Sequence, residues 1–269
     1  TLTVEAVNDT PVLAIVSDVS FDEDTSGSTS LSASDVDGDD LSYSVSGGTD
    51  ITATLSGTDV SFSASDNFNG SETFTFTVSD GELSDSQSIT VTVNAVNDAP
   101  VATAGLSTTT NEDQSVVVNL SGSDIDGDNL TFSLDTDATN GSVSIDGSIA
   151  TYTPTSNFNG SDTFSFSVSD GELSDTAEVT LTVNAINDAP ILITISDVSF
   201  DEDGSGSTSL SGSDVDGDDL TYTISGGSDI SASLSGTDIS FSAPANYNGS
   251  EEFSVSVSDG EYTDSQSIT

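Results

Sequence analysis

Acidic residues recur along the chain in two kinds of cluster. The motif SDVDGDDL at 34–41 has counterparts at 123–130 and 213–220, and a shorter motif, DED or NED, stands at 22–24, 111–113 and 201–203. Carboxylate and carbonyl oxygens are the ligands of hard divalent cations, and calcium takes about six to eight of them. Both clusters therefore predict sites for calcium or magnesium rather than for soft metals. The alternative for SDVDGDDL is a solvated acidic turn, in which Asp and Gly are ordinary.

Two other functions of such clusters are disfavoured. SDVDGDDL is not an EF-hand loop, because its glycine, Gly38, comes too early and Ser46 replaces the closing Glu. Paired carboxylates also hydrolyse glycosides. Each cluster occurs in three near-identical copies, however, whereas a catalytic site is normally unique in its chain. We therefore expect that the protein is not an enzyme.

The composition excludes further chemistry. The 269 residues include 47 Asp and Glu but no Lys, Arg, His or Cys, which gives a formal charge of −47. Nucleophilic Ser-His or Cys-His systems, thiol redox sites and ordinary zinc sites cannot be built without His or Cys. A polyanion also repels nucleic acid and anionic lipid. No apolar run approaches the length of about 20 residues that a membrane span needs.

The clusters belong to a unit that occurs three times. Pro11, Pro100 and Pro190 lie 89 and 90 residues apart, each after an Asn-Asp pair and one further residue. The motif NFNGS or NYNGS and the motif VSDGELSD or VSDGEYTD follow at nearly constant spacing. Between them, segments such as Phe74–Val78 and Ile89–Val93 alternate apolar and hydroxyl residues, which is typical of half-buried strands. About seven such strands per unit indicate a β-sandwich.

The two ends of the sequence match the interior of the unit. TLTVEA at 1–6 corresponds to TLTVNA at 180–185, which is a final strand, and SQSIT at 265–269 corresponds to SQSIT at 86–90. Two interpretations remain open at this point. The segment is a slice of a longer repetitive chain, or the first strand of one subunit completes the third sandwich of the next by strand addition.

The stretch FTFTVSDGELSDSQSITVTVNAVNDAP at 74–100 resembles the last two strands and linker of a cadherin repeat. It is still more similar to the bacterial cadherin-like repeats of large surface adhesins. This resemblance implies an all-β fold of tandem Ig/cadherin-like, seven-stranded Greek-key β-sandwiches in an elongated array. The expected parts are a strand with linker at 1–8 and three repeats at 9–98, 99–188 and 189–269, the last without the second half of its final strand.

The resemblance also implies calcium (Ca²⁺) between consecutive repeats. The first junction would use Glu23, Asn97, Asp98, Asp124, Asp126 and Asp170. The second would use Glu112, Asn187, Asp188, Asp214, Asp216 and Asp259. Half-junctions would consist of Asn8, Asp9, Asp35, Asp37 and Asp80 at the start and Glu202 at the end. Cadherins carry an acidic pair where this chain has Asn67 and Asn69, which predicts fewer or weaker ions.

These features together predict a calcium-rigidified extracellular stalk of a cell-surface adhesin, with roles in cell adhesion or biofilm. The alternative is the subunit of an extracellular filament that assembles head-to-tail. The expected partners are neighbouring repeats or identical subunits, and not nucleic acid. The sequence does not identify the adhesion target.

Overall fold

The strands alternate buried apolar side chains with polar side chains that face water. In β8 (Gly70–Ser79), Phe74, Phe76 and Val78 are buried, while the threonines between them are partly exposed. The computed structural model describes residues 1–269, which form strands, turns and loops but no helix. The prediction of an all-β fold is therefore confirmed, and no helix is present that could cross a membrane.

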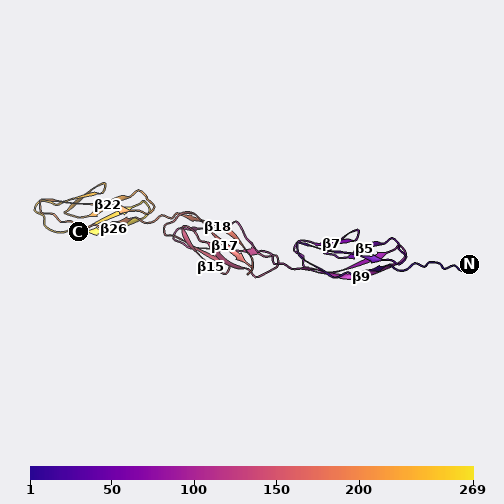
Figure 1. Ribbon diagram of the computed structural model, residues 1–269. Coiled ribbons are helices and arrows are strands. Elements are labelled where there is room, and N and C mark those ends of the chain that lie inside the picture. The colour runs from indigo at the N-terminus through magenta and orange to yellow at the C-terminus, as the bar shows by residue number, and fades with distance from the viewer. The chain divides into compact units, whose positions relative to one another are not determined.

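The first repeat contains strands β1 to β9, in two main sheets and one short pair (Figure 1). One sheet has the order β2-β9-β8-β5, the other has the order β3-β7-β6, and β1 pairs with β4. β2 runs parallel to β9, whereas the other pairs are antiparallel. The remaining bounds are β1 (Val12–Leu13), β2 (Val19–Asp22), β3 (Ser26–Ser30), β4 (Ala33–Ser34), β5 (Ser42–Gly47), β6 (Ile51–Ser56), β7 (Asp59–Ala64) and β9 (Ser84–Asn94).

The core of the first repeat lies between its two sheets. Phe62 of β7 meets Phe74 of β8 edge to face, with ring centroids 5.2 Å apart. Val91 and Val93 of β9 are buried in the same cluster. Burial of each such side chain contributes about 1.5–3 kcal/mol, so the alternating apolar positions stabilise the sandwich.

The second repeat has the same topology. Its sheets have the orders β11-β18-β17-β14 and β12-β16-β15, with β10 paired to β13, and β11 runs parallel to β18. The bounds are β10 (Val101–Ala102), β11 (Leu106–Asn111), β12 (Val116–Asn119), β13 (Gly122–Ser123), β14 (Thr131–Thr136), β15 (Gly141–Asp146), β16 (Ile149–Pro154), β17 (Gly160–Ser169) and β18 (Ser174–Asn184).

The third repeat differs along one edge. Its sheets are β22-β25-β26 and β20-β24-β23, with β19 paired to β21. Residues 198–201, which correspond to β2, do not form a strand, because the partner of β2 is the second half of β9 and β26 ends at Ile268. The bounds are β19 (Ile191–Leu192), β20 (Ser205–Ser209), β21 (Gly212–Ser213), β22 (Thr221–Gly226), β23 (Ser231–Ser235), β24 (Asp238–Ser242), β25 (Phe253–Ser258) and β26 (Thr263–Ile268).

The chain forms two compact units. The first comprises Thr1–Ala102, Gly122–Thr131 and Val168–Asp175, and the second comprises the rest. The first unit therefore contains the linker after the first repeat together with the loops of the second repeat that meet this linker. The linker after the second repeat and the whole third repeat lie in the second unit. Each of the two repeat junctions falls inside one unit.

Candidate metal centres at the repeat junctions

A buried glutamate stands at each junction. Glu23 and Glu112 are each only 4% exposed, although a carboxylate is normally solvated. The parallel pairing of β11 with β18 places Glu112 under the linker, where its N–H donates to Asn184 O at 3.0 Å. Its Oε1 accepts the N–H of Ile186, as Glu23 Oε1 accepts the N–H of Val96.

The second oxygen of each glutamate is buried without a hydrogen-bond partner. A buried charged oxygen without a partner is costly, because it loses water and gains nothing in return. Glu23 Oε2 and Glu112 Oε2 therefore point to a positively charged ligand. The chain carries no Lys, Arg or His, so no side chain of its own can supply that charge.

The motif SDVDGDDL supplies the next carboxylates. Asp35 Oδ1 accepts the N–H groups of Asp37 at 2.8 Å and of Gly38 at 3.0 Å, which folds the loop around the side chain. Gly38 has φ +81°, a backbone conformation that a glycine adopts without strain. Asp35 Oδ2 is buried without a partner, and so are Oδ2 of Asp124 and Asp214 at the equivalent positions.

Each of these loops brings three carboxylates together. In every repeat, oxygens of the first, third and fifth residues of the motif DVDGD or DIDGD lie within 4.8 Å of one another. The third member was not among the predicted ligands, although its spacing of two residues from the second could have indicated it. The three groups are Asp35, Asp37 and Asp39, then Asp124, Asp126 and Asp128, then Asp214, Asp216 and Asp218.

The linker residues attach to these loops through repeated contacts. Asp98 N–H donates to Asp126 Oδ2 at 2.8 Å, and Asp188 N–H donates to Asp216 Oδ2 at 2.7 Å. Asn187 Nδ2 donates to Asp259 Oδ2 at 3.0 Å, just as Asn97 Nδ2 donates to Asp170. The structure thus brings the predicted residues of each junction together.

Asp170 already has partners for both carboxylate oxygens. Asn97 Nδ2 donates to Oδ2 at 2.9 Å, and the N–H groups of Glu172 and Leu173 donate to Oδ1, both at 2.7 Å. The bond from Asn97, followed by the two backbone bonds, lowers the pKa of Asp170. The carboxylate thus holds both the hairpin turn between β17 and β18 and the linker.

The two linker aspartates, Asp98 and Asp188, have raised pKa values. Burial raises the pKa of Asp98, and the neighbouring carboxylates of Asp126, Asp24, Glu23 and Asp124 raise it further. Burial raises the pKa of Asp188 in the same way, with contributions from Asp216, Asp113, Glu112 and Asp214. Asp188 Oδ2 is also buried without a partner. Carboxylates of two repeats and of the linker therefore converge at each junction.

An asparagine stands where cadherins carry an acid. Asn67 has φ +56°, and its N–H donates to Asp24 Oδ1 at 3.0 Å, a contact that Asn157 repeats with Asp113. One end of the Asn67 carboxamide lies 2.9 Å from Asp98 Oδ2 and 3.3 Å from Asp24 Oδ2. With nitrogen at that end, the amide donates to both carboxylates. With oxygen there, it adds a neutral ligand to the same centre. Asp24 and Asp113 also were not among the predicted ligands.

The two predicted half-junctions differ in their contacts. At the first, Asn8 Nδ2 donates to Asp80 Oδ2 at 3.0 Å and Asp9 N–H donates to Asp37 Oδ2 at 2.8 Å, as at the complete junctions. At the other, Glu202 is exposed, because no linker segment covers it.

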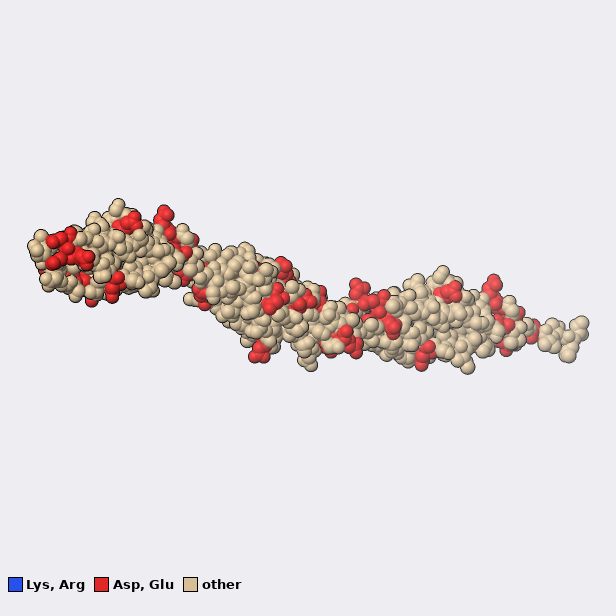
Figure 2. Space-filling model, turned by 60° about the vertical axis from the view of Figure 1, so that its left-hand side comes forward, with Lys and Arg blue, Asp and Glu red and all other residues tan.

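Another set of aspartates has a role that the sequence did not indicate. Asp85, Asp175 and Asp264 are the last residues of the motifs VSDGELSD and VSDGEYTD. In the structure their Oδ2 atoms accept the N–H groups of Leu13 and Ala102, both at 2.9 Å, and of Leu192 at 2.8 Å. They hold the first short strand of each repeat to the hairpin of β9 or its equivalents. On the face that Figure 2 shows, acidic side chains lie in separate groups, and no Lys or Arg is present.

One solved structure supports the fold. The cadherin domains 1–5 of protocadherin gamma B2 match with a TM-score of 0.52 and 16% identity, over 97% of this chain and 59% of that one. An endo-fucoidan hydrolase of glycoside hydrolase family 107 matches with a TM-score of 0.32 and 17% identity, over 97% of this chain and 44% of that one. The chain thus spans less than two thirds of these structures. At 16% identity the likeness to the protocadherin concerns the fold alone, and the match to the hydrolase, with a TM-score of 0.32, carries no argument.

No curated protein matches the sequence. A family model described as bacterial Ig domain matches three times, over residues 8–93, 97–182 and 187–269. These matches cover nearly the whole chain and place one domain in each of the three sandwiches. The predicted resemblance to bacterial cadherin-like or Ig tandem repeats is confirmed, and the chain belongs to the bacterial Ig domain family.

Proposed function

We propose that this chain is a calcium-rigidified spacer of an extracellular adhesin, in which Ca²⁺ joins consecutive repeats. The observation that carries the proposal is the set of buried carboxylate oxygens without partners at each junction. At the second junction these are Glu112 Oε2, Asp188 Oδ2 and Asp214 Oδ2, which come from the second repeat, the linker and the third repeat. One cation among them would satisfy all three.

The donor set suits calcium. All candidate ligands are oxygens of carboxylates, amides or backbone, without the nitrogen or sulfur that zinc and copper prefer. The candidate ligands come from several segments of the chain, including loops. Such a set favours the larger, geometrically tolerant Ca²⁺ over Mg²⁺, which demands a near-ideal octahedron. The Asn67 carboxamide, with its oxygen turned inward, adds a ligand of this kind.

Metal binding and stiffening are the same event at these junctions. The ligands belong to both flanking repeats, so binding requires the repeats and the linker to hold one arrangement. Without cations the crowded carboxylates repel one another and favour separation of the parts. At a free calcium concentration 100 times the dissociation constant, one site contributes about 2.7 kcal/mol. Calcium is therefore expected to convert a flexible hinge into a stiff joint.

The role as a spacer follows from repetition. The same centre occurs at successive junctions, which suits a structural element, since a catalytic centre is normally present once. We accordingly propose that the segment itself does no catalysis. The absence of Lys and Arg removes every trypsin-type cleavage site, which suits an exposed fibre on a cell surface.

Calcium titration of the purified chain tests this proposal. We expect heat release on binding, a higher melting temperature, and small-angle scattering that changes from a flexible to a stiff particle, all reversed by EDTA. The double variant Asp124→Asn, Asp126→Asn should lose binding at the first junction only. Asp146→Asn removes an exposed charge of the same repeat outside the clusters and serves as control. Melting and scattering that ignore calcium would refute the proposal.

A further inference from the structure

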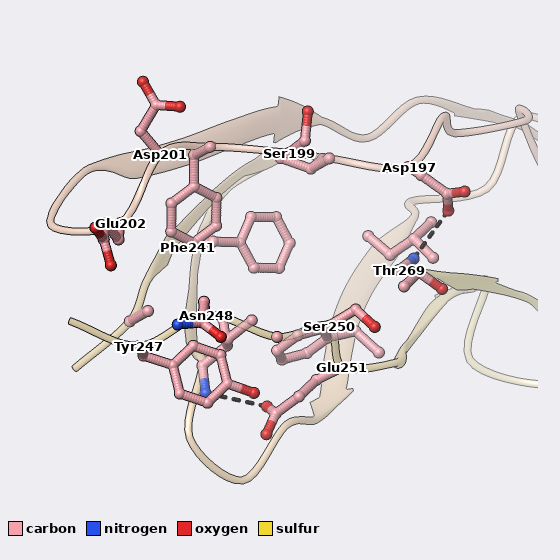
Figure 3. Close-up of a pocket in the computed structure, with 17 residues that line it drawn as sticks. Asp197, Ser199, Asp201, Glu202, Phe241, Tyr247, Asn248, Ser250, Glu251 and Thr269 are labelled. Carbon is pink, nitrogen blue, oxygen red and sulfur yellow. Dashed lines mark hydrogen bonds between the residues drawn. The ribbon is translucent and has the colours of Figure 1, made fainter. Parts of the chain in front are cut away.

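The loop that precedes β8 meets the acidic motif DED or NED in every repeat. In the first repeat, Asn67 N–H donates to Asp24 Oδ1 at 3.0 Å. The equivalent contacts of the second and third repeats are both 3.1 Å long. Figure 3 shows the two segments facing one another in the third repeat, with Glu202 on one and Asn248 on the other. An asparagine is therefore held beside the acidic motif in each repeat.

The side chain of Asn67 reaches across the first junction. The residue has φ +56°, a left-handed conformation in which Asn and Gly are favoured over most other residues. One end of its carboxamide lies 2.9 Å from Asp98 Oδ2 and 3.3 Å from Asp24 Oδ2. Asp24 belongs to the first repeat and Asp98 belongs to the linker. The carboxamide thus lies between an acid of the repeat and an acid of the linker.

Electrostatics determines which end of the carboxamide faces these acids when no cation is bound. The carboxylates of Asp24 and Asp98 are close enough that Asp24 contributes to the raised pKa of Asp98. An amide oxygen turned toward them would meet only acceptors, whereas the amide nitrogen donates to both. Hydrogen bonds to ionised acceptors are stronger than bonds between neutral groups. With its nitrogen inward, Asn67 joins the linker to the first repeat without a metal ion.

The second junction lacks this contact. Asn157 has φ +58°, and its N–H donates to Asp113 Oδ1, as at the first junction. Asp188 Oδ2, which corresponds to Asp98 Oδ2, is nevertheless buried without a hydrogen-bond partner. The carboxamide of Asn157 therefore does not donate to the linker acid. Without a cation, the second junction leaves unpaired an oxygen that is paired at the first.

We propose that the Asn67 carboxamide is a two-way brace of the first junction, with nitrogen inward when no cation is bound and oxygen inward as a ligand of Ca²⁺. Only the second orientation rests on the proposed calcium function. The terminal torsion of asparagine is broad and roughly twofold, so exchange of nitrogen and oxygen requires no movement of the backbone. An aspartate at this position would add charge to the centre and bind calcium more tightly, but it would repel both acids in the absence of calcium. The first junction therefore stays closed at calcium concentrations at which the second opens.

Two substitutions at Asn67 separate the two orientations. Asn67→Gly removes the carboxamide, keeps the N–H and suits φ +56°. Asn67→Asp places a third carboxylate beside Asp24 and Asp98. In EDTA the ratio of closed to open junctions should fall about tenfold or more with Asn67→Gly, because hydrogen bonds to charged acceptors are lost, and further with Asn67→Asp. In calcium the two variants should diverge, since Asn67→Asp strengthens binding at the first junction and Asn67→Gly weakens it.

Single-molecule energy transfer measures the closed and open populations of each junction. The chain contains no Cys, so dyes attach only at introduced positions. Ser61→Cys with Ser144→Cys labels exposed positions on either side of the first junction, and Ser144→Cys with Ser233→Cys does so for the second. We expect a narrower distribution at the first junction than at the second in EDTA, and equally narrow distributions in calcium.

Two controls accompany the Asn67 variants. Asn157→Gly removes the same side chain at the other junction, where it makes no contact with the linker acid, and should leave both distributions in EDTA unchanged. Thr54→Asp adds one charge to the first repeat at an exposed position of β6 and should have no effect on either junction. The NMR signals of the Asn67 side-chain amide report its orientation, and they should shift when calcium is added.

The EDTA measurements decide on the brace independently of calcium. An unchanged first junction in Asn67→Gly, or a more closed one in Asn67→Asp, would overturn the inference. Equal distributions of the two junctions in the unmodified chain in EDTA would also contradict it. A chain whose junctions and melting ignore calcium would instead refute the proposed calcium function, and the comparison in EDTA would still show whether Asn67 closes the first junction.

Discussion

The substitution Glu112→Gln should stabilise the second junction without calcium and weaken it with calcium. Glu112 Oε1 accepts a hydrogen bond from the N–H of Ile186, and glutamine keeps that acceptor. Oε2 is buried without a partner, in a site where Glu112 also acts on the carboxylate of Asp188. Glutamine replaces this oxygen with a neutral donor that faces carboxylates.

The two conditions give effects of opposite sign. In EDTA the variant loses an unpaired buried charge, which should increase the free energy of unfolding by about 1–3 kcal/mol. For a domain of this size, each kcal/mol raises the melting temperature by about 4–8 °C. In calcium the variant lacks a charged ligand. It should therefore lose much of the increment of about 2.7 kcal/mol that one site contributes at 100 times its dissociation constant.

Calorimetric melting in EDTA and in calcium measures both signs. Hydrogen exchange of the linker peptide that contains Ile186 assigns the effect to the second junction. Glu202→Gln is the matched control, because Glu202 occupies the same position of the third repeat and is exposed. Glu202→Gln should leave the melting curves in EDTA and in calcium unchanged. A lower melting temperature of Glu112→Gln in EDTA, or an undiminished calcium increment, would refute the assignment of Oε2 as a cation ligand.

Three further predictions concern the hydrogen bonds and pKa values of individual aspartates. Asp162 is 5% exposed and accepts hydrogen bonds from the N–H groups of Thr139, Asn140 and Thr163 and from Tyr152 Oη. Asp162→Ala should therefore lower the free energy of unfolding of the second repeat by about 3–5 kcal/mol. Urea unfolding measures this, and an unchanged midpoint would contradict it. The raised pKa values of Asp98 and Asp188 mean that their protonated forms favour the closed junction. In EDTA the linkers should loosen as pH rises through these folded-state values, a trend that scattering at several pH values detects and that calcium should abolish. The lowered pKa of Asp170 has the opposite effect on stability: its hydrogen bond with Asn97 is lost as pH falls through the folded-state pKa. Asp170→Asn should remove this loosening at acid pH, which the NMR shift of the Asn97 amide reports.

Local patterns in the sequence were sufficient to predict most of the fold. Alternation in segments such as Phe74–Val78 determines which side chains enter a core, and this period does not depend on distant residues. The threefold repetition of the acidic motifs likewise located the candidate sites, because ligands of one loop are close in sequence. Asp39 and its equivalents were missed although the same local signal includes them.

The tertiary structure decided which oxygens have partners. Glu112 is buried only because β11 pairs in parallel with β18, about 70 residues later, which brings Ile186 over its carboxylate. The sequence could not show that Asp170 is used by a turn and a linker, or that Asp85 holds β1. Hydrogen-bond satisfaction depends on long-range register, whereas motifs and periodicities are local. The sequence therefore indicated the candidate ligands, and the fold decided which of their oxygens have hydrogen-bond partners.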